Sequence, residues 1–249
     1  MDMWADQRAS TTREFESATA RQIEQALRAT RRAMIQTIHA VSTVAGQRDH
    51  YTALHQSLTA TLSLAIGREL GLEDSKLEGV YLGALVHDIG KISIPSELLA
   101  KPSKLTPEEY SLIKTHVMSG VKIFEGVSLP WPVQSIVRQH HERLDGSGYP
   151  DGVAGDAIIL EARIVAVADV FEAITSHRPY RPAREANAAL WELEQGAGRK
   201  FDTAAVEALS RIVDGMGSDQ GSFWSKIESG IDFGSTVRVP RPIDRIASK

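Results

Sequence analysis

The sequence of 249 residues contains no cysteine. Disulfides, thiolate nucleophiles and cysteine-ligated zinc or iron–sulfur sites are therefore excluded, and any metal must be held by histidine and carboxylate side chains. Positive charge is also in short supply, because 28 Lys and Arg residues stand against 32 Asp and Glu residues. With a net charge of −4, the chain has no overall positive field that would bind a nucleic acid polymer. Local basic residues still allow a small phosphorylated ligand.

Long apolar runs are missing as well. The longest of them, such as residues 164–168, are far shorter than the roughly 20 residues that a membrane-spanning helix needs. Residues 1–10 lack the basic patch and apolar core of a secretory or transit peptide. We therefore expect no membrane span and a cytoplasmic protein. The composition, 42% hydrophobic and 24% charged, is typical of one compact globular domain with extra elements.

Apolar residues recur at helical spacing, and no segment shows the strict alternation of a half-buried strand. The sequence therefore predicts an all-α protein. Residues 106–109, Thr-Pro-Glu-Glu, provide an N-cap, a proline in the first turn and a capping-box glutamate for a helix that ends near Phe124. Gly71 and Gly90 are predicted to be left-handed ends of the helices before them. The predicted helices cover about 12–44, 51–70, 73–89, 106–124, 133–142, 160–175, 184–194 and 202–213.

The predicted helix at 12–44 carries one stripe of residues at spacings of three and four. Two threonines weaken this stripe as a coiled-coil seam. The helix either packs on its own domain or pairs with a second chain, and we predict a parallel homodimer through it. We expect an N-terminal helix over 1–46, a main domain over 47–215 and a loosely structured tail over 216–249. The stripe consists of Ala20, Ile23, Leu27, Thr30, Met34, Thr37 and Val41.

Seven ionisable side chains occupy apolar faces of the predicted helices. A single inward histidine is more often a hydrogen-bonded core residue than a metal ligand. Seven such side chains would each cost several kcal/mol to bury without a compensating charge, so we expect divalent metal among them. Seven ligands exceed the roughly four to six of one ion, which predicts two ions bridged by Asp88. The seven residues are His55, His87, Asp88, His116, His140, His141 and Asp169.

Two motifs in this set resemble the HD-GYP family, a branch of the HD metal-dependent phosphohydrolases. The first is His-Asp-Ile-Gly-Lys at 87–91, and the second is His-His-Glu-Arg-Leu-Asp-Gly-Ser-Gly-Tyr-Pro at 140–150. The resemblance covers about residues 48–209. It implies an HD-type helical bundle behind the long N-terminal helix, with the catalytic domain over 47–215. It also implies hydrolysis of cyclic di-GMP to pGpG, and in some members to GMP, by a hydroxide that bridges two metals.

The resemblance also implies which residues hold each metal. Tyr51 stands where some family members have a glutamate that supports a third metal, so we expect two ions. Imidazole and carboxylate ligands without thiolate suit iron, manganese or zinc, and we expect iron or manganese. The implied ligands are His55, His87, Asp88 and Asp169 for the first ion, and Asp88, His116, His140 and His141 for the second.

Further residues are implied to bind the substrate. Lys91 matches a family lysine near the scissile phosphate, where it would stabilise charge in the transition state. Arg178 and Arg181 stand where members place basic residues against the phosphates. Taken alone, the two arginines would more often be surface charges, and the alternative for Lys91 is a solvated loop lysine. Gly148 allows close backbone approach and Tyr149 would border a guanine, although the loop is otherwise a rigid turn or a docking point for a protein partner.

The remaining expectations concern supporting residues and alternatives. Glu142 and Asp145 are expected to orient the histidine ligands and brace the loop rather than bind metal. Leu58 and Leu144 replace a common arginine and a frequent tryptophan of the family, which leaves rate and substrate preference open, and Arg181 replaces a lysine. One alternative function is a catalytically weak sensor of cyclic dinucleotides that docks a partner. The other is an HD hydrolase of another phosphoester, such as cyclic GMP-AMP.

Overall fold

The computed structural model describes residues 3–48, 50–177, 182–216, 223–224 and 227. The regular elements among these residues are all helices, with no strand, which confirms the predicted all-α class. None of the helices in these ranges has the length and apolar character to cross a membrane. The helices are α1 (Met3–Arg48), α2 (His50–Glu69), α3 (Asp74–Val86), α4 (Ser96–Leu99), α5 (Pro107–Lys114), α6 (His116–Ile123), α7 (Val133–Gln139), α8 (Leu160–Thr175), α9 (Ala186–Glu194) and α10 (Thr203–Met216), with the short 3-10 helices η1 (Ile89–Ser93) and η2 (Gly155–Ala157).

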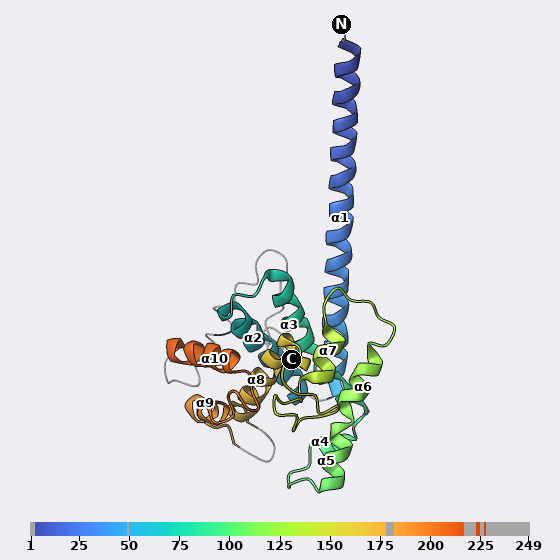
Figure 1. Ribbon diagram of the computed structural model, residues 1–249. Coiled ribbons are helices and arrows are strands. Elements are labelled where there is room, and N and C mark those ends of the chain that lie inside the picture. The colour runs from blue at the N-terminus through green and yellow to red at the C-terminus, as the bar shows by residue number, and fades with distance from the viewer. Residues whose placement is uncertain (1–2, 49, 178–181, 217–222, 225–226, 228–249) are drawn as a thin grey trace.

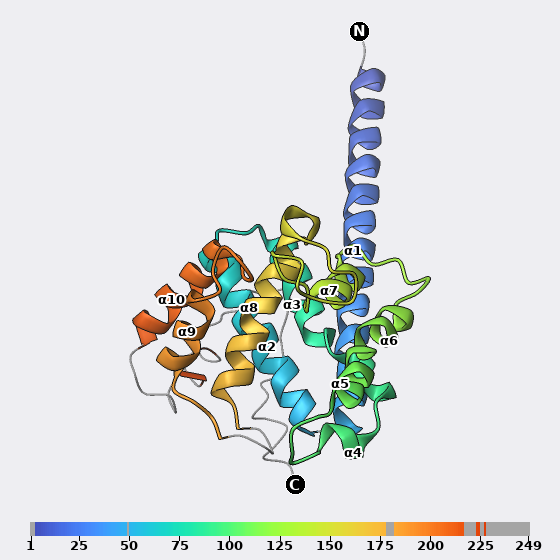
Figure 2. The ribbon, with the colours of Figure 1, turned by 60° about the horizontal axis from the view of Figure 1, so that its bottom comes forward.

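Helices α2, α3 and α8 form the centre of the bundle (Figures 1 and 2). Each contributes fully buried apolar side chains to one continuous core, for example Leu62, Val80 and Phe171. Burying such a side chain stabilises the fold by roughly 1.5–3 kcal/mol. Helices α9 and α10 pack beside each other on one side of this centre, and α5, α6 and α7 lie on the other (Figure 2). Helix α8 is therefore a buried central helix, as its apolar sequence predicts.

Helix α1 is longer than predicted, and only its C-terminal part packs on the bundle (Figure 1). Ile35 and Ile38 are buried in the core. Arg31 donates two hydrogen bonds, of 2.9 and 2.6 Å, to one carboxylate oxygen of Glu78 on α3. Farther toward the N-terminus, Ile23 is 56% exposed. The end of α1 thus packs on the same domain, but through a face that includes Ile35 and Ile38. In the predicted stripe, Met34 and Val41 are only partly buried and Thr37 is exposed.

The end of α3 differs from the prediction. The helix ends at Val86 rather than near residue 89, and η1 begins directly after Asp88. Gly71 has the predicted left-handed conformation, with φ of 72°, but Gly90 does not have a positive φ. Gly90 is required for another reason, because a Cβ there would overlap the carbonyl of His116. A close approach of η1 to α6, rather than a helix end, explains this glycine.

The predicted helix over 106–124 divides into two at Thr115. Its capping box is confirmed: the Thr106 hydroxyl accepts from the backbone of Glu109, and the Glu109 carboxylate accepts from the backbone of Thr106. The break makes His116 the first residue of α6. It therefore places this candidate ligand at a helix end that faces η1.

Three described residues beyond α10 pack on the core. Phe223 and Ile227 are almost fully buried, and the ring of Phe223 lies 5.5 Å from the ring of Phe171 on α8. The ring of Trp224 lies 6.3 Å from the same phenylalanine. The other residues from 217 onward, where a loose tail is predicted, lie outside the described residues.

Candidate metal centre

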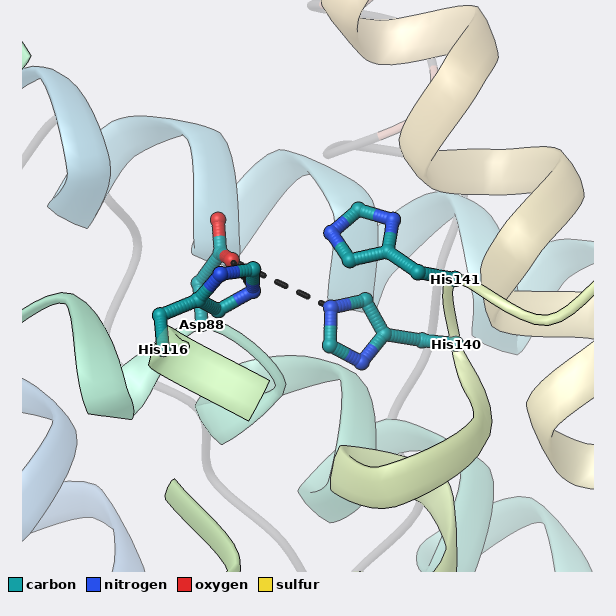
Figure 3. Close-up of side chains that lie close together, drawn as sticks. All are labelled: Asp88, His116, His140 and His141. Atoms are coloured by element: carbon teal, nitrogen blue, oxygen red, sulfur yellow. Dashed lines mark ion pairs between the residues drawn. The ribbon is translucent and has the colours of Figure 1, made fainter. Parts of the chain in front are cut away.

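The candidate ligands come from separate parts of the chain and converge on Asp88, as Figure 3 shows for three of the histidines. Six of the seven are buried, and His141 is half-buried. The packing of α2, α3 and α8 with the ends of α6 and α7 brings them together. The elements supply them as follows: α2 carries His55, the segment after α3 carries His87 and Asp88, α6 begins with His116, the segment after α7 carries His140 and His141, and α8 carries Asp169.

The two oxygens of the Asp88 carboxylate face two different groups of histidines. Oδ1 lies 3.2 Å from Nε2 of His116 and 3.9 Å from Nε2 of His140. Oδ2 lies 3.5 Å from Nε2 of His55 and 3.4 Å from Nε2 of His87. This is the arrangement that a carboxylate needs to bridge two ions. Within each group the ligand atoms lie within 4.8 Å of one another, and the groups are Asp88, His116, His140 and His141, and His55, His87 and Asp88.

Asp169 adds a second carboxylate beside one of these groups. Its Oδ1 lies 3.1 Å from Nε2 of His55 and 3.8 Å from Nε2 of His87. His55 and His87 thus stand between the two carboxylates. This group therefore has two imidazoles and two carboxylates around it, as the resemblance implies for the first ion.

Backbone carbonyls fix the orientation of three imidazoles. In each, Nδ1 lies 2.6–2.8 Å from the carbonyl oxygen of the residue three positions earlier. A carbonyl can only accept a hydrogen bond, so each Nδ1 carries a proton, and in the neutral ring the lone pair is on Nε2. These Nε2 atoms are buried without a hydrogen-bond partner in the described part of the chain, and so is Oδ1 of Asp88. The three pairs are His87 with Ala84, His116 with Ile113, and His140 with Val137.

Unpaired buried lone pairs are costly, at about 1–3 kcal/mol each, unless a cation or a donor meets them. Here the three Nε2 atoms lie 3.2–3.9 Å from an oxygen of the same Asp88 carboxylate. Nitrogen and oxygen donors of this kind are ligands of divalent iron, manganese and zinc. The residues present therefore fit divalent metal.

Burial and neighbouring charges set the ionisation of the cluster. Burial lowers the pKa of His141 to about 3 and holds that of His140 well below its usual range, so both rings are neutral near pH 7. Burial opposes ionisation of Asp88, but Lys91 and then His87 hold the pKa of this carboxyl well below its usual range. The Lys91 ammonium donates a hydrogen bond to Oδ2 of Asp88. The predicted substrate lysine therefore lies directly beside the candidate bridging carboxylate.

Glu172 is a site residue that the sequence analysis missed. Its Oε2 accepts a hydrogen bond from Nδ1 of His55, and its Oε1 accepts one of 2.6 Å from the hydroxyl of Ser176. The carboxylate is almost fully buried. Although burial opposes protonation of His55, Glu172 and then Asp169 hold the pKa of this imidazole well above its usual range. Glu172 lies one helical turn after Asp169 on α8, but its partner His55 lies on α2, so spacing within α8 does not reveal the contact.

Glu142 and Asp145 both brace the loop at 145–152. Oε1 of Glu142 accepts hydrogen bonds from the backbone nitrogens of Asp151 at 2.7 Å and Gly152 at 3.1 Å. Oδ1 of Asp145 accepts one of 3.1 Å from the backbone nitrogen of Ser147. The partners of the imidazoles are instead the backbone carbonyls and Glu172. The two acidic residues therefore shape the loop that borders the cluster.

The loop places Tyr149 against the cluster. Its ring stacks on that of His141, with centroids 4.6 Å apart and planes at 30°. A Cβ at Gly148 would overlap the backbone of His141 and Glu142, so glycine is needed for this close approach. The predicted Arg178 and Arg181 lie outside the described residues, and so does the side chain of Tyr51.

Comparisons with known proteins agree with this geometry. Residues 13–205 match the model of a family described as HD domain. The cyclic di-GMP phosphodiesterase response regulator RpfG of Xanthomonas campestris is 43% identical over 166 residues, which cover 66% of this chain and 44% of that protein. The 3'3'-cGAMP-specific phosphodiesterase 1 of Vibrio cholerae is 42% identical over 147 residues, which cover 59% of this chain and 34% of that protein. The chain spans less than half of the length of these curated relatives.

A solved structure shares the fold. The HDG"Y"P protein from Bdellovibrio bacteriovorus superposes with a TM-score of 0.57 over 72% of this chain and 64% of its own chain. Its sequence is 21% identical, so this likeness supports the fold alone. Together, the matches confirm the resemblance that the two motifs carry.

Proposed function

Because this chain belongs to the HD domain family, we propose that it is a metal-dependent phosphodiesterase that hydrolyses cyclic di-GMP. The observation that carries the proposal is the Asp88 carboxylate, whose two oxygens face two groups of imidazoles with inward lone pairs. Relatives at 43% and 42% identity are named as phosphodiesterases of cyclic di-GMP and of 3'3'-cGAMP. The catalytic part would be residues 47–215.

In this proposal the two histidine groups hold one divalent ion each, iron or manganese, with Asp88 between them and Asp169 beside His55 and His87. Two such ions would supply a hydroxide nucleophile near neutral pH and neutralise charge on the phosphate. Backbone carbonyls and Glu172 keep the imidazoles in the tautomer that binds metal. The protein contributes a set of donors that are oriented before the substrate arrives.

The substrate would be held by residues around the cluster. Lys91 lies beside Asp88 and would stabilise negative charge that grows on the phosphate in the transition state. Tyr149 and Gly148 border the cluster on the loop, and Arg178 and Arg181 would bind phosphate oxygens. The product would be pGpG, with GMP as a further product, and the reaction would take place in the cytoplasm.

A second candidate substrate is cyclic GMP-AMP. A relative named as specific for 3'3'-cGAMP is 42% identical, so the similarity does not separate it from cyclic di-GMP. The two substrates differ in one purine, and selectivity between them depends on hydrogen bonds to the base edge. Turnover of both substrates must therefore be measured side by side.

We further propose a parallel homodimer through α1. Ile23 and Leu27 lie four residues apart and are 56% and 65% exposed, which supports a seam for a second copy. The loop that contains Gly148 and Tyr149 is the proposed docking point for a protein partner.

The proposal is tested by comparing wild type with Asp88→Asn, loaded in turn with iron or manganese under reducing conditions. We expect about two equivalents of metal in wild type, and a loss of metal with at least a thousandfold loss of turnover in the variant. Asp156→Asn is a matched control, because the Asp156 side chain is fully exposed on η2. Chromatography of the products distinguishes pGpG from GMP. Two equivalents of metal without turnover of either dinucleotide would favour the sensor function instead.

A further inference from the structure

A lysine and a tyrosine outside the predicted site lie next to the candidate metal centre. Lys114 is the last residue of α5, two positions before His116. Its ammonium lies 5.7 Å from the ring centroid of Tyr149 and 5.4 Å from that of Tyr110. Because Tyr149 stacks on His141, Lys114 is separated from a candidate metal ligand by a single aromatic ring.

In the part of the chain that the structure describes, no carboxylate neutralises the charge of Lys114. Among the residues that the structure describes, the ammonium groups of Lys91 and Lys101 are paired with Asp88 and Glu109. No described carboxylate lies within ion-pair distance of Lys114, whose contacts are the two tyrosine rings. An ammonium held over aromatic faces keeps its full charge for an incoming anion.

Tyr110 offers an exposed aromatic ring beside this charge. Tyr110 is 48% exposed, and its position four residues before Lys114 places both side chains on one face of α5. Tyr149 is half-buried, with burial and then the nearby Tyr110 raising its pKa, so it stays neutral. Stacking of a base on an aromatic side chain contributes about 1–3 kcal/mol, whatever the base.

A cyclic dinucleotide contains two phosphodiesters and two purines, and the metals would engage only the phosphodiester that is cleaved. Building on the proposed function, we propose that Tyr110, Lys114 and Tyr149 form a subsite for the other phosphate and its adjoining purine. The ammonium, held over the ring of Tyr149, meets the phosphate, and the exposed ring of Tyr110 contacts the base. This subsite would favour cyclic dinucleotides over phosphodiesters that lack a second phosphate.

The test is steady-state kinetics of Lys114→Met with manganese, on cyclic di-GMP and on bis(p-nitrophenyl) phosphate, which has one phosphodiester and no second phosphate. We expect KM for cyclic di-GMP to rise about tenfold, as for loss of one charge-assisted contact, with kcat within about twofold. Both parameters for bis(p-nitrophenyl) phosphate should be unchanged, and Lys114→Arg should restore KM. Tyr110→Ala should raise KM for cyclic di-GMP in the same direction.

Lys122→Met is the matched control, because Lys122 also lies in the last turn of its helix, α6, and is exposed. If Lys122→Met changes KM as much as Lys114→Met does, the rise in KM comes from losing any lysine at a helix end, and the subsite is refuted. An unchanged KM in Lys114→Met also refutes the subsite but leaves the proposed function intact. If wild type hydrolyses only bis(p-nitrophenyl) phosphate and calorimetry detects no binding of cyclic di-GMP or cyclic GMP-AMP, both proposals fail.

Discussion

At the scale of single residues, the imidazole of His55 is held at both of its nitrogens. Its Nε2 faces Asp169 at 3.1 Å and Asp88 at 3.5 Å, while its Nδ1 donates to Glu172. Glu172 is itself held by the hydroxyl of Ser176. Such a carboxylate fixes both the tautomer and the direction of the lone pair that a metal would meet.

We predict that Glu172→Ala weakens binding of manganese by about tenfold to a hundredfold, the usual cost of removing a partner of a ligand histidine. The reason is that the His55 ring loses its fixed orientation, although the ligand itself is unchanged. Titration calorimetry of metal-free protein with manganese measures the change. Glu172→Asp, which keeps the carboxylate, should recover part of the affinity.

Glu161→Ala is the control for this prediction, because Glu161 lies in the first turn of the same helix, α8. This variant should bind manganese as wild type does. If Glu172→Ala titrates like Glu161→Ala, then Glu172 does not position His55, and its burial has a purely structural role.

The seven candidate ligands could be found from the sequence because each interrupts an otherwise apolar helical face. Glu172 could not be found in this way. Helix α8 is apolar nearly all round, so one more polar residue in it has no distinct pattern. Its contact with His55 spans 117 positions of sequence and arises only from the packing of α2 on α8. Periodicity within one helix carries no information about such a contact.

At the scale of elements, the sequence did not predict the two helix breaks beside the cluster, after Val86 and at Thr115. Apolar spacing continues through residues 87–88 and through Thr115, so periodicity predicts unbroken helices there. The breaks arise where η1 crosses α6 so closely that Gly90 has no room for a side chain. Breaks with a local cause, such as the capping box at Thr106 and the turn at Gly71, were predicted correctly.

Substitutions at two apolar positions of α1, Ile38 and Leu27, are predicted to have different effects on stability. Ile38 is 3% exposed and packs in the core, whereas Leu27 is 65% exposed. We expect Ile38→Asp to lower the free energy of unfolding by more than about 3 kcal/mol, because it removes a buried side chain and buries a charge. Leu27→Glu should change the stability of the monomer very little. Urea unfolding of Ile38→Asp and Leu27→Glu measures the difference in the free energy of unfolding.

The same pair tests the proposed dimer. Light scattering at micromolar protein should give the mass of two chains for wild type and of one chain for Leu27→Glu, because glutamates would face each other across the seam. A wild-type protein with the mass of one chain would contradict the dimer, whatever the stability of Ile38→Asp.

At the scale of the whole molecule, the charged cluster lies where the main helices meet. Helices α2 and α8, the segments after α3 and α7, and the start of α6 each contribute at least one candidate ligand. These are also the elements whose apolar faces form the common core. A cation at the cluster would therefore connect elements that are distant in sequence, and its binding should be coupled to the stability of the entire bundle.

Removal of metal should accordingly destabilise the fold. A ligand at a hundredfold excess over its dissociation constant stabilises the native state by about 2.7 kcal/mol, which raises Tm by about 5–11 °C in a domain of 150–250 residues. We expect the Tm of chelator-treated protein to rise by about this amount for each manganese site that is filled, in calorimetric scans at increasing manganese. In Asp88→Asn most of this rise should disappear, because Asp88 is shared by both groups of ligand atoms. An equal rise in wild type and in Asp88→Asn would mean that manganese binds elsewhere on the molecule.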